Sequence, residues 1–324
     1  MLESHNAKAL GTDLRASARV LVFTATYNER DNIGLLIDAI AGVAPHADIL
    51  VVDDNSPDGT WEVIQERRIK YKQLKGVKRP RKLGIGTAHK YAVLYAIRES
   101  YDFLLTMDAD FSHHPLYIPL LLNEAGSNVF VTGSRYCKGG SCGYTGYRAI
   151  VSRLGNLVAR HLLSLPLFEL TTYFRVFDVS TLRILPLSRI NASGYTYGVQ
   201  LIYYLKISGV KLKEVPIHFL DRVYGESKIP KLQILLSALD VMRLSFRRPT
   251  RLDYSTSGEF IGSSCIHCGD SVLALEIRRT NARFKNALEQ RAGAVPIYRC
   301  LNCDQLQTVI SSSEPFISTE KQLV

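Results

Sequence analysis

The chain has 324 residues, 46% of them hydrophobic, and its formal net charge at pH 7 is +10. This length is sufficient for one large domain with a full core and a second, smaller domain. Residues 1–18 are polar and mixed in charge, which predicts a disordered N-terminus and argues against a signal peptide. No apolar run is long enough for a transmembrane helix, so we expect a cytoplasmic protein.

The excess of positive charge is concentrated between Arg67 and Lys82, a stretch with nine Lys or Arg residues and no acid. One interpretation is attraction to phosphate, whether in a nucleotide, a lipid head group or a nucleic acid. The other is a helix face and loop that are simply solvated. The sequence leaves both open.

Short apolar segments alternate with segments of helical periodicity between residues 19 and 250. Strands are expected at Val20–Thr24, Ile49–Val52, Tyr101–Met107 and Phe130–Gly133. Helices are expected at 31–43, from Thr60 onward, at 84–96, at 150–165 and at 232–246. This alternation predicts an α/β domain with a Rossmann-like, mainly parallel sheet and helices on both faces. The helix at 232–246 ends in arginines and has two interpretations, a core helix or an interfacial membrane helix.

Acidic side chains follow two of the expected strands. Asp108 and Asp110 come directly after an apolar strand, and residues two apart share one face of a strand. Two carboxylates suit a hard divalent cation whose other ligands are diphosphate oxygens and water. Asp53 and Asp54 end another strand. The two pairs predict a nucleotide and its metal at the carboxyl ends of the strands.

Two loops near these acids have polar groups suited to a nucleoside. Residues 26–29 offer an aromatic ring for stacking, and residues 53–60 offer carboxylates that accept from ring N–H groups and sugar hydroxyls. His113 and His114 stand beside the second acid pair, either as metal ligands or as residues that shape the turn. Because Pro115 follows them, we favour the turn.

Several of these strings, in this order, resemble the dolichol-phosphate mannose synthase family of inverting glycosyltransferases. The matching strings are 26–29, 53–60, 84–88, 107–115, 133–136 and 221–228. The resemblance covers about residues 19–245. It implies an A-type glycosyltransferase domain over residues 19–250 that transfers mannose from GDP-mannose to a polyprenyl (dolichyl) phosphate. It also implies a peripheral location on the cytosolic membrane face.

The resemblance further implies roles for individual residues. The nucleotide-sugar would be held by Thr26, Tyr27, Glu29, Asp53, Asp54, Asp108, Ala109 and Arg135. A Mg²⁺ or Mn²⁺ ion would be held by Asp108, Asp110 and Ser112. The acceptor phosphate would be held by Arg148, Ser152, Arg222 and Lys228, and the residues expected to matter most for catalysis are Asp110, Arg222 and Lys228.

The chain departs from the family pattern at two places. Ala25 stands where the family has proline, and the string 169–175 has Glu169 for aspartate and Thr172 for a smaller residue. Because that string lies near the sugar in the resembling enzymes, another donor such as UDP-glucose stays open. A second alternative is an inactive zinc-ribbon module that binds nucleic acid or protein. The intact acids and the string 221–228 argue against it, so a nucleic-acid partner is not expected.

The C-terminal part has its own signature. Cys265, Cys268, Cys300 and Cys303 form two C-x-x-C pairs, typical of a four-cysteine zinc ribbon at residues 263–310. Strand-like residues at 272–277 and 295–298 accompany them. Four thiolates complete a tetrahedral site, so the expected Zn²⁺ is structural. A Ser-rich linker at 251–262 precedes the ribbon, and a tail at 311–324 follows the ribbon. A membrane-embedded subunit is one partner that the ribbon could dock.

Overall fold

The computed structural model describes residues 18–143, 146–187, 190, 196–219 and 231–246, together with short strands at 273–275, 297–300 and 306–308. For residues 147–148, 231–238 and the three short strands, only the backbone is described. Residues 1–17 of the expected N-terminal segment 1–18, the expected linker 251–262 and the expected tail 311–324 lie outside the described residues. Among the expected site residues, the same holds for Arg222, Lys228, Cys265, Cys268 and Cys303.

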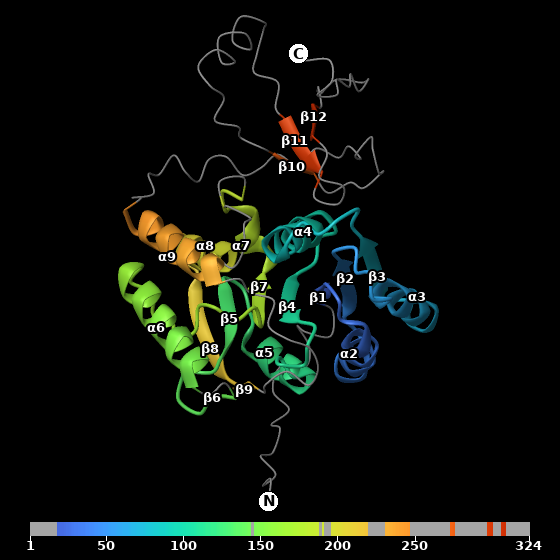
Figure 1. The fold of residues 1–324 in the computed structure, drawn as a ribbon, viewed down its shortest axis with the longest axis horizontal. Coiled ribbons are helices and arrows are strands. Elements are labelled where there is room, and N and C mark those ends of the chain that lie inside the picture. The colour runs from blue at the N-terminus through green and yellow to red at the C-terminus, as the bar shows by residue number, and fades with distance from the viewer. Residues whose placement is uncertain are drawn as a thin grey trace, which may run out of the picture.

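A central, mostly parallel sheet organises the large domain (Figure 1). Its seven described strands follow the order β3-β2-β1-β4-β7-β5-β8. Only β7 is antiparallel, and it pairs with both β4 and β5. The strands are β1 (Val20–Thr26), β2 (Asp48–Asp53), β3 (Leu74–Lys78), β4 (Phe103–Asp108), β5 (Val129–Ser134), β7 (Arg175–Asp178) and β8 (Lys211–Pro216).

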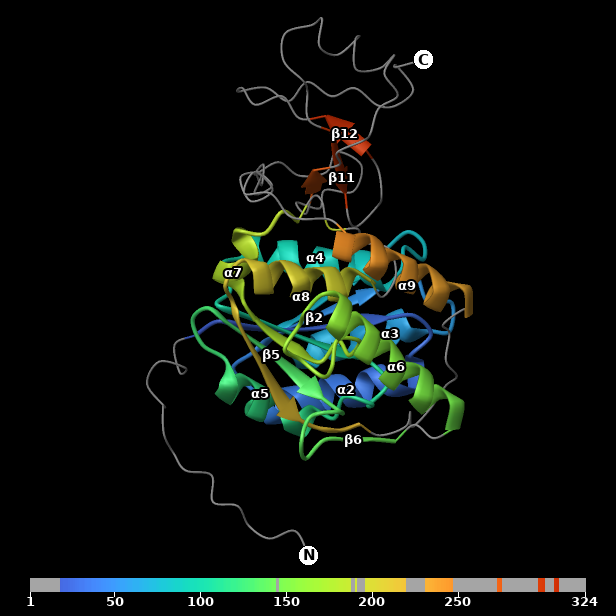
Figure 2. The same ribbon diagram turned by 90° about the vertical axis from the view of Figure 1, so that its left-hand side faces the viewer.

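Helices cover both faces of this sheet (Figure 2). One face carries α2 (Arg30–Val43), α3 (Thr60–Lys70) and α5 (Ile118–Glu124), the last preceded by the 3₁₀ turn η1 (Pro115–Tyr117). The other face carries α4 (Ile85–Arg98), α7 (Val179–Arg183), α8 (Thr196–Ile207) and α9 (Lys231–Phe246). The helix α6 (Gly146–Leu162) packs beside α9, and the short strands β6 (Ser141–Cys142) and β9 (His218–Phe219) pair in parallel.

The two hydrophobic cores follow from the alternation of side chains along the strands. In β1, Leu21 and Phe23 point into the core beneath α4 and α8, whereas Val22 points into the core beneath α2. Leu50 and Ile49 of β2 divide in the same way. Strands with apolar side chains on both sides therefore need helices on both faces, which confirms the predicted α/β architecture with a mainly parallel sheet.

Several elements differ from the expectation, and besides those described next, α5, α7 and β8 were not expected either. The basic stretch is neither all helix nor loop, because its centre forms the edge strand β3, in which Leu74 alone is buried. The antiparallel strand β7 and the helix α8 were not expected at all. The string that forms β7 has only four residues, too few to show a period.

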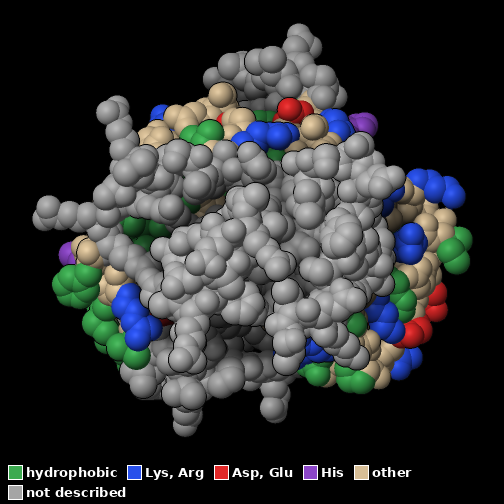
Figure 3. All heavy atoms as spheres, turned by 90° about the horizontal axis from the view of Figure 1, so that it is seen from above, with side chains coloured by type: hydrophobic (Ala, Val, Ile, Leu, Met, Phe, Trp, Pro, Cys, Tyr) green, Lys and Arg blue, Asp and Glu red, His purple; other side chains and the backbone are tan. Residues whose placement is uncertain are grey.

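The basic residues between Arg67 and Lys82 do not form one continuous face. Arg67 and Lys70 bind Asp38 of α2, while Arg79 is buried in an ion pair at the end of the sheet. In Figure 3 the Lys and Arg side chains on the side of α3 and β3 lie in separate groups. Several of these cations therefore hold the helices and loops of the domain together.

A second, antiparallel sheet lies in the C-terminal part of the chain. It has the order β10-β11-β12, formed by β10 (Leu273–Leu275), β11 (Ile297–Cys300) and β12 (Leu306–Thr308). The strands β10 and β11 fall at the two strand-like segments expected for the zinc ribbon. Cys300 is the last residue of β11 and pairs with Leu273.

Within the described part of the chain, no helix combines the length and the apolar character that crossing a bilayer requires.

Candidate active site

Three parallel strands bring the expected nucleotide and metal residues to one edge of the sheet. Thr26 at the end of β1 pairs with Asp53 at the end of β2. On the other side of β1, Ala25 pairs with Asp108 at the end of β4. The carboxyl ends of parallel strands meet at the same edge, where open α/β sheets bind their ligands.

The carboxylate of Asp53 fixes the loop that follows β2. It is fully buried and accepts from the Thr26 hydroxyl at 3.0 Å, the Ser56 backbone N–H at 3.0 Å and the Ser56 hydroxyl at 2.5 Å. Three donors satisfy an anion that burial would otherwise penalise. Asp53 therefore joins the loops after β1 and β2 from the inside.

Asp54 joins a different pair of elements. One carboxylate oxygen lies 2.8 Å from Nη1 of the buried Arg79, and the other accepts from the backbone N–H of Gly84 at 2.8 Å. Gly84 precedes α4 with a φ of +91°, a conformation that glycine adopts without strain. Asp54 thus holds the N-terminus of α4 against the end of β2.

The loop after β1 is bonded to the loop after β2 through its backbone. The N–H of Asn28 donates to the Ser56 hydroxyl, and the N–H of Glu29 donates to the Thr60 hydroxyl. Lys82 places its ammonium 3.8 Å from the centre of the Tyr27 ring, within cation–π distance. Tyr27 and a cation from the basic stretch therefore stand together at this edge.

The two acids after β4 occupy different environments. Asp110 is buried, and one of its oxygens accepts from the Ser112 backbone N–H at 3.1 Å and the Ser112 hydroxyl at 2.5 Å. The side chain of Asp108 is one-third exposed. Phe111, between Asp110 and Ser112, has a φ of +62°, so the chain reverses sharply there. Asp108, Asp110 and Ser112 form a single oxygen-rich turn at the rim, and Ala109 is buried within it.

His113 is hydrogen-bonded to this turn from its buried side. Its Nδ1 accepts from the Asp108 backbone N–H at 2.9 Å, so its Nε2 carries the proton and donates to the Thr172 hydroxyl at 2.7 Å. Complete burial lowers the pKa of His113 to about 3, which keeps the ring neutral. Both ring nitrogens are bonded within the protein, and His114 accepts from the Leu116 N–H. The interpretation of these histidines as turn-shaping residues is confirmed.

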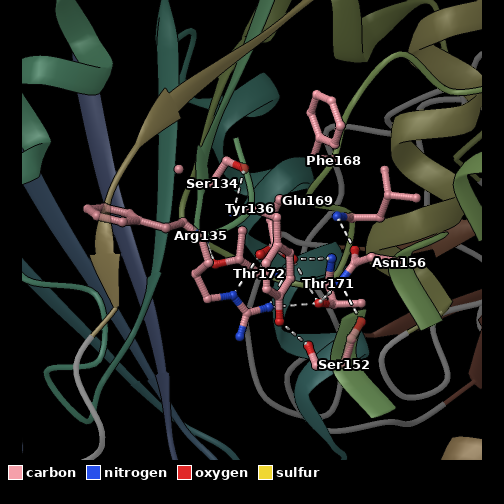
Figure 4. A network of polar contacts seen from close by, with 12 residues as sticks. Ser134, Arg135, Tyr136, Ser152, Asn156, Phe168, Glu169, Thr171 and Thr172 are labelled. Atoms are coloured by element: carbon pink, nitrogen blue, oxygen red, sulfur yellow. Dashed lines mark hydrogen bonds and ion pairs between the residues drawn. The ribbon is translucent and has the colours of Figure 1, made fainter. Parts of the chain in front are cut away.

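Arg135 forms a buried ion pair with Glu169 (Figure 4). Its Nε and Nη2 lie 2.6 Å and 2.9 Å from the two carboxylate oxygens, a bidentate geometry, and Nη2 also donates to the Thr171 hydroxyl. Burial alone raises the pKa of Glu169, but the Arg135 charge and the hydrogen bonds outweigh it and lower the pKa. Arg135, the arginine expected near the sugar phosphate, thus binds the loop at 169–172.

The helix α6 is bonded to the same loop. Ser152 accepts a hydrogen bond from the Tyr136 hydroxyl at 2.8 Å. One turn later, Asn156 accepts from the Leu170 N–H and donates to the Thr171 hydroxyl (Figure 4). Of the expected acceptor-phosphate residues, the structure therefore places Ser152 beside Tyr136, and the backbone of Arg148 lies on the same helix.

Arg175 and Tyr173 lie behind the acidic turn. Arg175 is fully buried and donates to the backbone carbonyls of Gly198 and Leu170 at 3.1 and 2.7 Å. Burial lowers its pKa to about 10, so it stays cationic at neutral pH. Tyr173 stacks on His89 with ring centres 3.9 Å apart, and burial raises its pKa to about 12.

Sequence reasoning did not identify Asn156 or the contact of His113 with Thr172. Asn156 is one of several polar residues along α6, and no spacing distinguishes it from its solvated neighbours. The partners His113 and Thr172 lie 59 residues apart. Only the antiparallel pairing of β7 with β4 brings their loops together.

Comparison with known proteins agrees with this arrangement. The sequence profile of glycosyl transferase family 2 matches residues 21–184. An undecaprenyl-phosphate mannosyltransferase of Micrococcus luteus is 35% identical over 212 residues, which are 65% of this chain and 87% of the relative. A polyprenol monophosphomannose synthase of Mycolicibacterium smegmatis is 33% identical over 220 residues, which are 67% of this chain and 83% of the relative.

A solved structure shares the fold. Glucosyl-3-phosphoglycerate synthase from Mycobacterium tuberculosis, in complex with Mn²⁺, UDP and glucosyl-3-phosphoglycerate, superposes with a TM-score of 0.52 at 19% identity. The match covers 73% of this chain and 82% of that one, and it supports an A-type glycosyltransferase fold. Since the family profile spans half of the chain and both relatives are matched over most of their length, the chain belongs to glycosyl transferase family 2 and is a glycosyltransferase.

Proposed function

We propose that this enzyme transfers mannose from GDP-mannose to a polyprenyl phosphate with inversion at the sugar, using a divalent cation. The two curated relatives, named for mannosyl transfer to undecaprenyl phosphate and for polyprenol monophosphomannose synthesis, support the sugar and the acceptor class. The observation that carries the proposal is the acidic turn at 108–112, which stands at the carboxyl end of β4 next to the loops after β1 and β2.

The residues of the acidic turn fit a Mg²⁺ or Mn²⁺ ion. Asp108 and Asp110 are hard oxygen donors at a strand end, and Ser112 holds one oxygen of Asp110. His113 does not compete as a ligand, because both of its nitrogens are bonded. When bound, such an ion offsets the negative charge of the departing nucleoside diphosphate.

The remaining groups of the chain position the reactants. We assign Tyr27, Lys82 and Glu29 to the base and phosphates of the donor; the cation–π contact of Lys82 with Tyr27 at the carboxyl end of β1 supports this. The acceptor phosphate is already an anion, so no side chain has to remove a proton from it. We assign Arg148, Ser152, Arg222 and Lys228 to that phosphate, because their charge and hydroxyl would offset the repulsion between the two substrates.

One observation favours a different donor, UDP-glucose. The loop at 169–173 carries Thr172 and Tyr173 next to the acidic turn, and Tyr173 is a large ring packed against His89. The structural neighbour from M. tuberculosis holds UDP. Thermal shift with Mn²⁺ separates the donors, because a bound ligand raises Tm by mass action. A rise with UDP-glucose and none with GDP-mannose would replace our choice of donor.

The acidic turn itself is tested by Asp110→Asn. Loss of one carboxylate from the cation site should lower transfer of mannose to polyprenyl phosphate by about a hundredfold or more, because a metal supplies several kcal/mol of stabilisation. The matched control is Asp31→Asn, an exposed carboxylate in the first turn of α2, which should keep full activity. Near-normal transfer by Asp110→Asn would remove Asp110 from the metal site.

For the C-terminal part we propose a structural zinc ion held by Cys265, Cys268, Cys300 and Cys303. The spacing of the two C-x-x-C pairs supports it, as does the antiparallel sheet in which Cys300 ends β11.

A further inference from the structure

His113 joins two loops that are far apart in the sequence. Its Nδ1 accepts from the backbone N–H of Asp108 in the acidic turn at 2.9 Å, and its Nε2 donates to the hydroxyl of Thr172 in the loop at 169–172 at 2.7 Å. The ring therefore connects the turn that carries the expected cation ligands to the loop that Arg135 and α6 bind. Because each nitrogen has a different partner, one orientation of the ring satisfies both loops.

The pocket around His113 fixes that orientation. The ring stacks on Phe174 with centres 5.0 Å apart and an interplanar angle of 19°, and its edge contact with Phe219 has centres 5.5 Å apart. Only 1% of the residue is exposed. Since protein interiors are close-packed, the ring has no room to shift, and a shifted ring would lose both hydrogen bonds.

The hydroxyl that receives the hydrogen bond is itself held in place. The backbone N–H of Phe174 donates to the Thr172 hydroxyl at 3.3 Å, and the N–H of Thr172 donates to the Glu169 carboxylate at 3.1 Å (Figure 4). Glu169 is fixed in turn by its bidentate ion pair with Arg135. A continuous set of contacts therefore runs from the acidic turn through His113 to the ion pair. Buried networks of this kind rigidify the elements that they connect.

The hydrogen bond to His113 fixes the backbone of a residue that we assign to the cation. Asp108 ends β4 and its side chain is one-third exposed, whereas Asp110 is buried and bonded to Ser112. Partners outside the set of ligands orient a metal ligand before the ion arrives, and their loss weakens the site. His113 is such a partner, because both of its nitrogens are bonded within the protein and one of them holds the Asp108 N–H.

We propose that His113 is a positioning residue that couples the divalent-cation site to the loop at 169–172, so that the cation binds tightly only while Thr172 holds the ring. The proposal deepens the proposed function, on which it rests for the cation. Thr172 thus influences an ion to which we assign it no ligand role. Because coupling between two sites is reciprocal, a bound cation should in turn stabilise the loop at 169–172.

The test measures Mn²⁺ binding by the full chain with GDP or UDP present, from the loss of the electron paramagnetic resonance signal of the free ion. Thr172→Val removes the hydroxyl and keeps the size of the side chain, and His113→Phe removes both hydrogen bonds of the ring. Each should weaken Mn²⁺ binding by about tenfold or more, the loss typical when a partner of a metal ligand is removed. A merely structural role would lower Tm and leave the affinity for Mn²⁺ unchanged.

Two further variants separate the two hydrogen bonds. His113→Asn keeps an acceptor near the position of Nδ1 for the Asp108 N–H, and His113→Gln keeps a donor near the position of Nε2 for Thr172. Each should bind Mn²⁺ more tightly than His113→Phe and more weakly than wild type. The matched control is His89→Phe, because His89 is a second buried histidine, stacked on Tyr173 and outside the acidic turn. It should keep the Mn²⁺ affinity of wild type.

Wild-type Mn²⁺ affinity in a folded Thr172→Val protein would overturn the proposal, and this variant decides the question if His113→Phe does not fold. A wild-type chain that binds no Mn²⁺ with either nucleotide would overturn it as well. Failure of the proposed function gives a different result. The wild-type chain would then bind Mn²⁺ and Thr172→Val would weaken that binding, while no mannose passes from GDP-mannose to polyprenyl phosphate.

Discussion

At the residue scale, several buried carboxylates of the domain are bound by other side chains of the protein. Asp53 accepts from two loops, Asp54 pairs with Arg79, and Glu169 binds Arg135 through both oxygens. A buried ion pair costs desolvation, so its stability depends on full satisfaction of both partners. Glu169 meets this condition, because the hydroxyl and N–H of Thr171 donate to it as well.

This residue gives a stability prediction with a defined pH dependence. Glu169→Gln leaves Arg135 buried without its counter-ion and should lower the free energy of unfolding at neutral pH by about 3–5 kcal/mol. The pKa of Glu169 is lowered below its ordinary value of 4.5 in the folded state. Its contribution is therefore complete above pH 4.5 and is lost as the pH falls through the folded-state pKa.

Urea unfolding of wild type and variant at a series of pH values measures this difference. It should shrink steadily below pH 4.5. The exposed pair of Glu124 and Lys213 supplies the control, since Glu124→Gln should cost about 0–1 kcal/mol at any pH. A Glu169→Gln penalty that does not change with pH would show that the ion pair is not its source.

At the element scale, the loop at 169–174 is held from several sides. α6 binds it through Asn156, the acidic turn binds it through His113, and α8 approaches it where Gly198 meets Arg175. The sequence raised a membrane role for the helix at 232–246. The structure shows that α9 buries Val241 and Leu244 in the core and exposes Met242 and Phe246. Among the residues whose side chains the structure describes, α6 exposes more large apolar residues than α9.

The close approach of α8 gives the second stability prediction. A Cβ at position 198 would lie 2.5 Å from Nη1 of Arg175 and 3.0 Å from the Tyr173 ring. Arg175 cannot swing away, because it is buried and bonded to the Leu170 carbonyl. Gly198→Ala should therefore cost about 1–3 kcal/mol.

Gly155 makes the matched control because it lies inside α6 with nothing within 4 Å of a built Cβ. Gly155→Ala should stabilise the protein by about 0.5–1 kcal/mol, since alanine loses less entropy in a helix. Thermal unfolding of both variants shows whether each substitution lowers or raises the stability of the protein. A Gly198→Ala protein as stable as wild type would mean that Arg175 has room to move.

At the scale of the whole molecule, we expect the transferase domain and the zinc ribbon to be separable in function. The purified chain should hold about one zinc ion, and Cys265→Ser should abolish stoichiometric zinc. Cys137→Ser is the control, because Cys137 follows β5 and hydrogen-bonds locally to Ser134. Metal analysis measures the zinc content of each variant, and sugar transfer to a soluble acceptor measures the activity of the transferase domain. Zinc retained in full by Cys265→Ser would exclude the four-cysteine site.

Much of the architecture could be predicted because it depends on local patterns. Apolar strands alternating with amphipathic helices predicted the α/β sheet, and the acids after β2 and β4 predicted which edge carries the site. β7 could not be predicted, since four residues show no period and its antiparallel pairing is made with distant strands. β3 could not be predicted either, because it is an edge strand in which Leu74 alone is buried, so its sequence has no apolar run.

By itself, the sequence determined four of the parallel strands, the position of the acidic turn and the family, because these follow from residues that are neighbours in the chain. Tertiary structure decided which charged side chains form buried ion pairs. Arg135 and Asp54, which we expected to contact the nucleotide-sugar, also form buried ion pairs with Glu169 and Arg79, whose partners are distant in the sequence. It also decided which apolar helix faces solvent, since a helical stripe looks the same in the sequence whether a core or a membrane covers it.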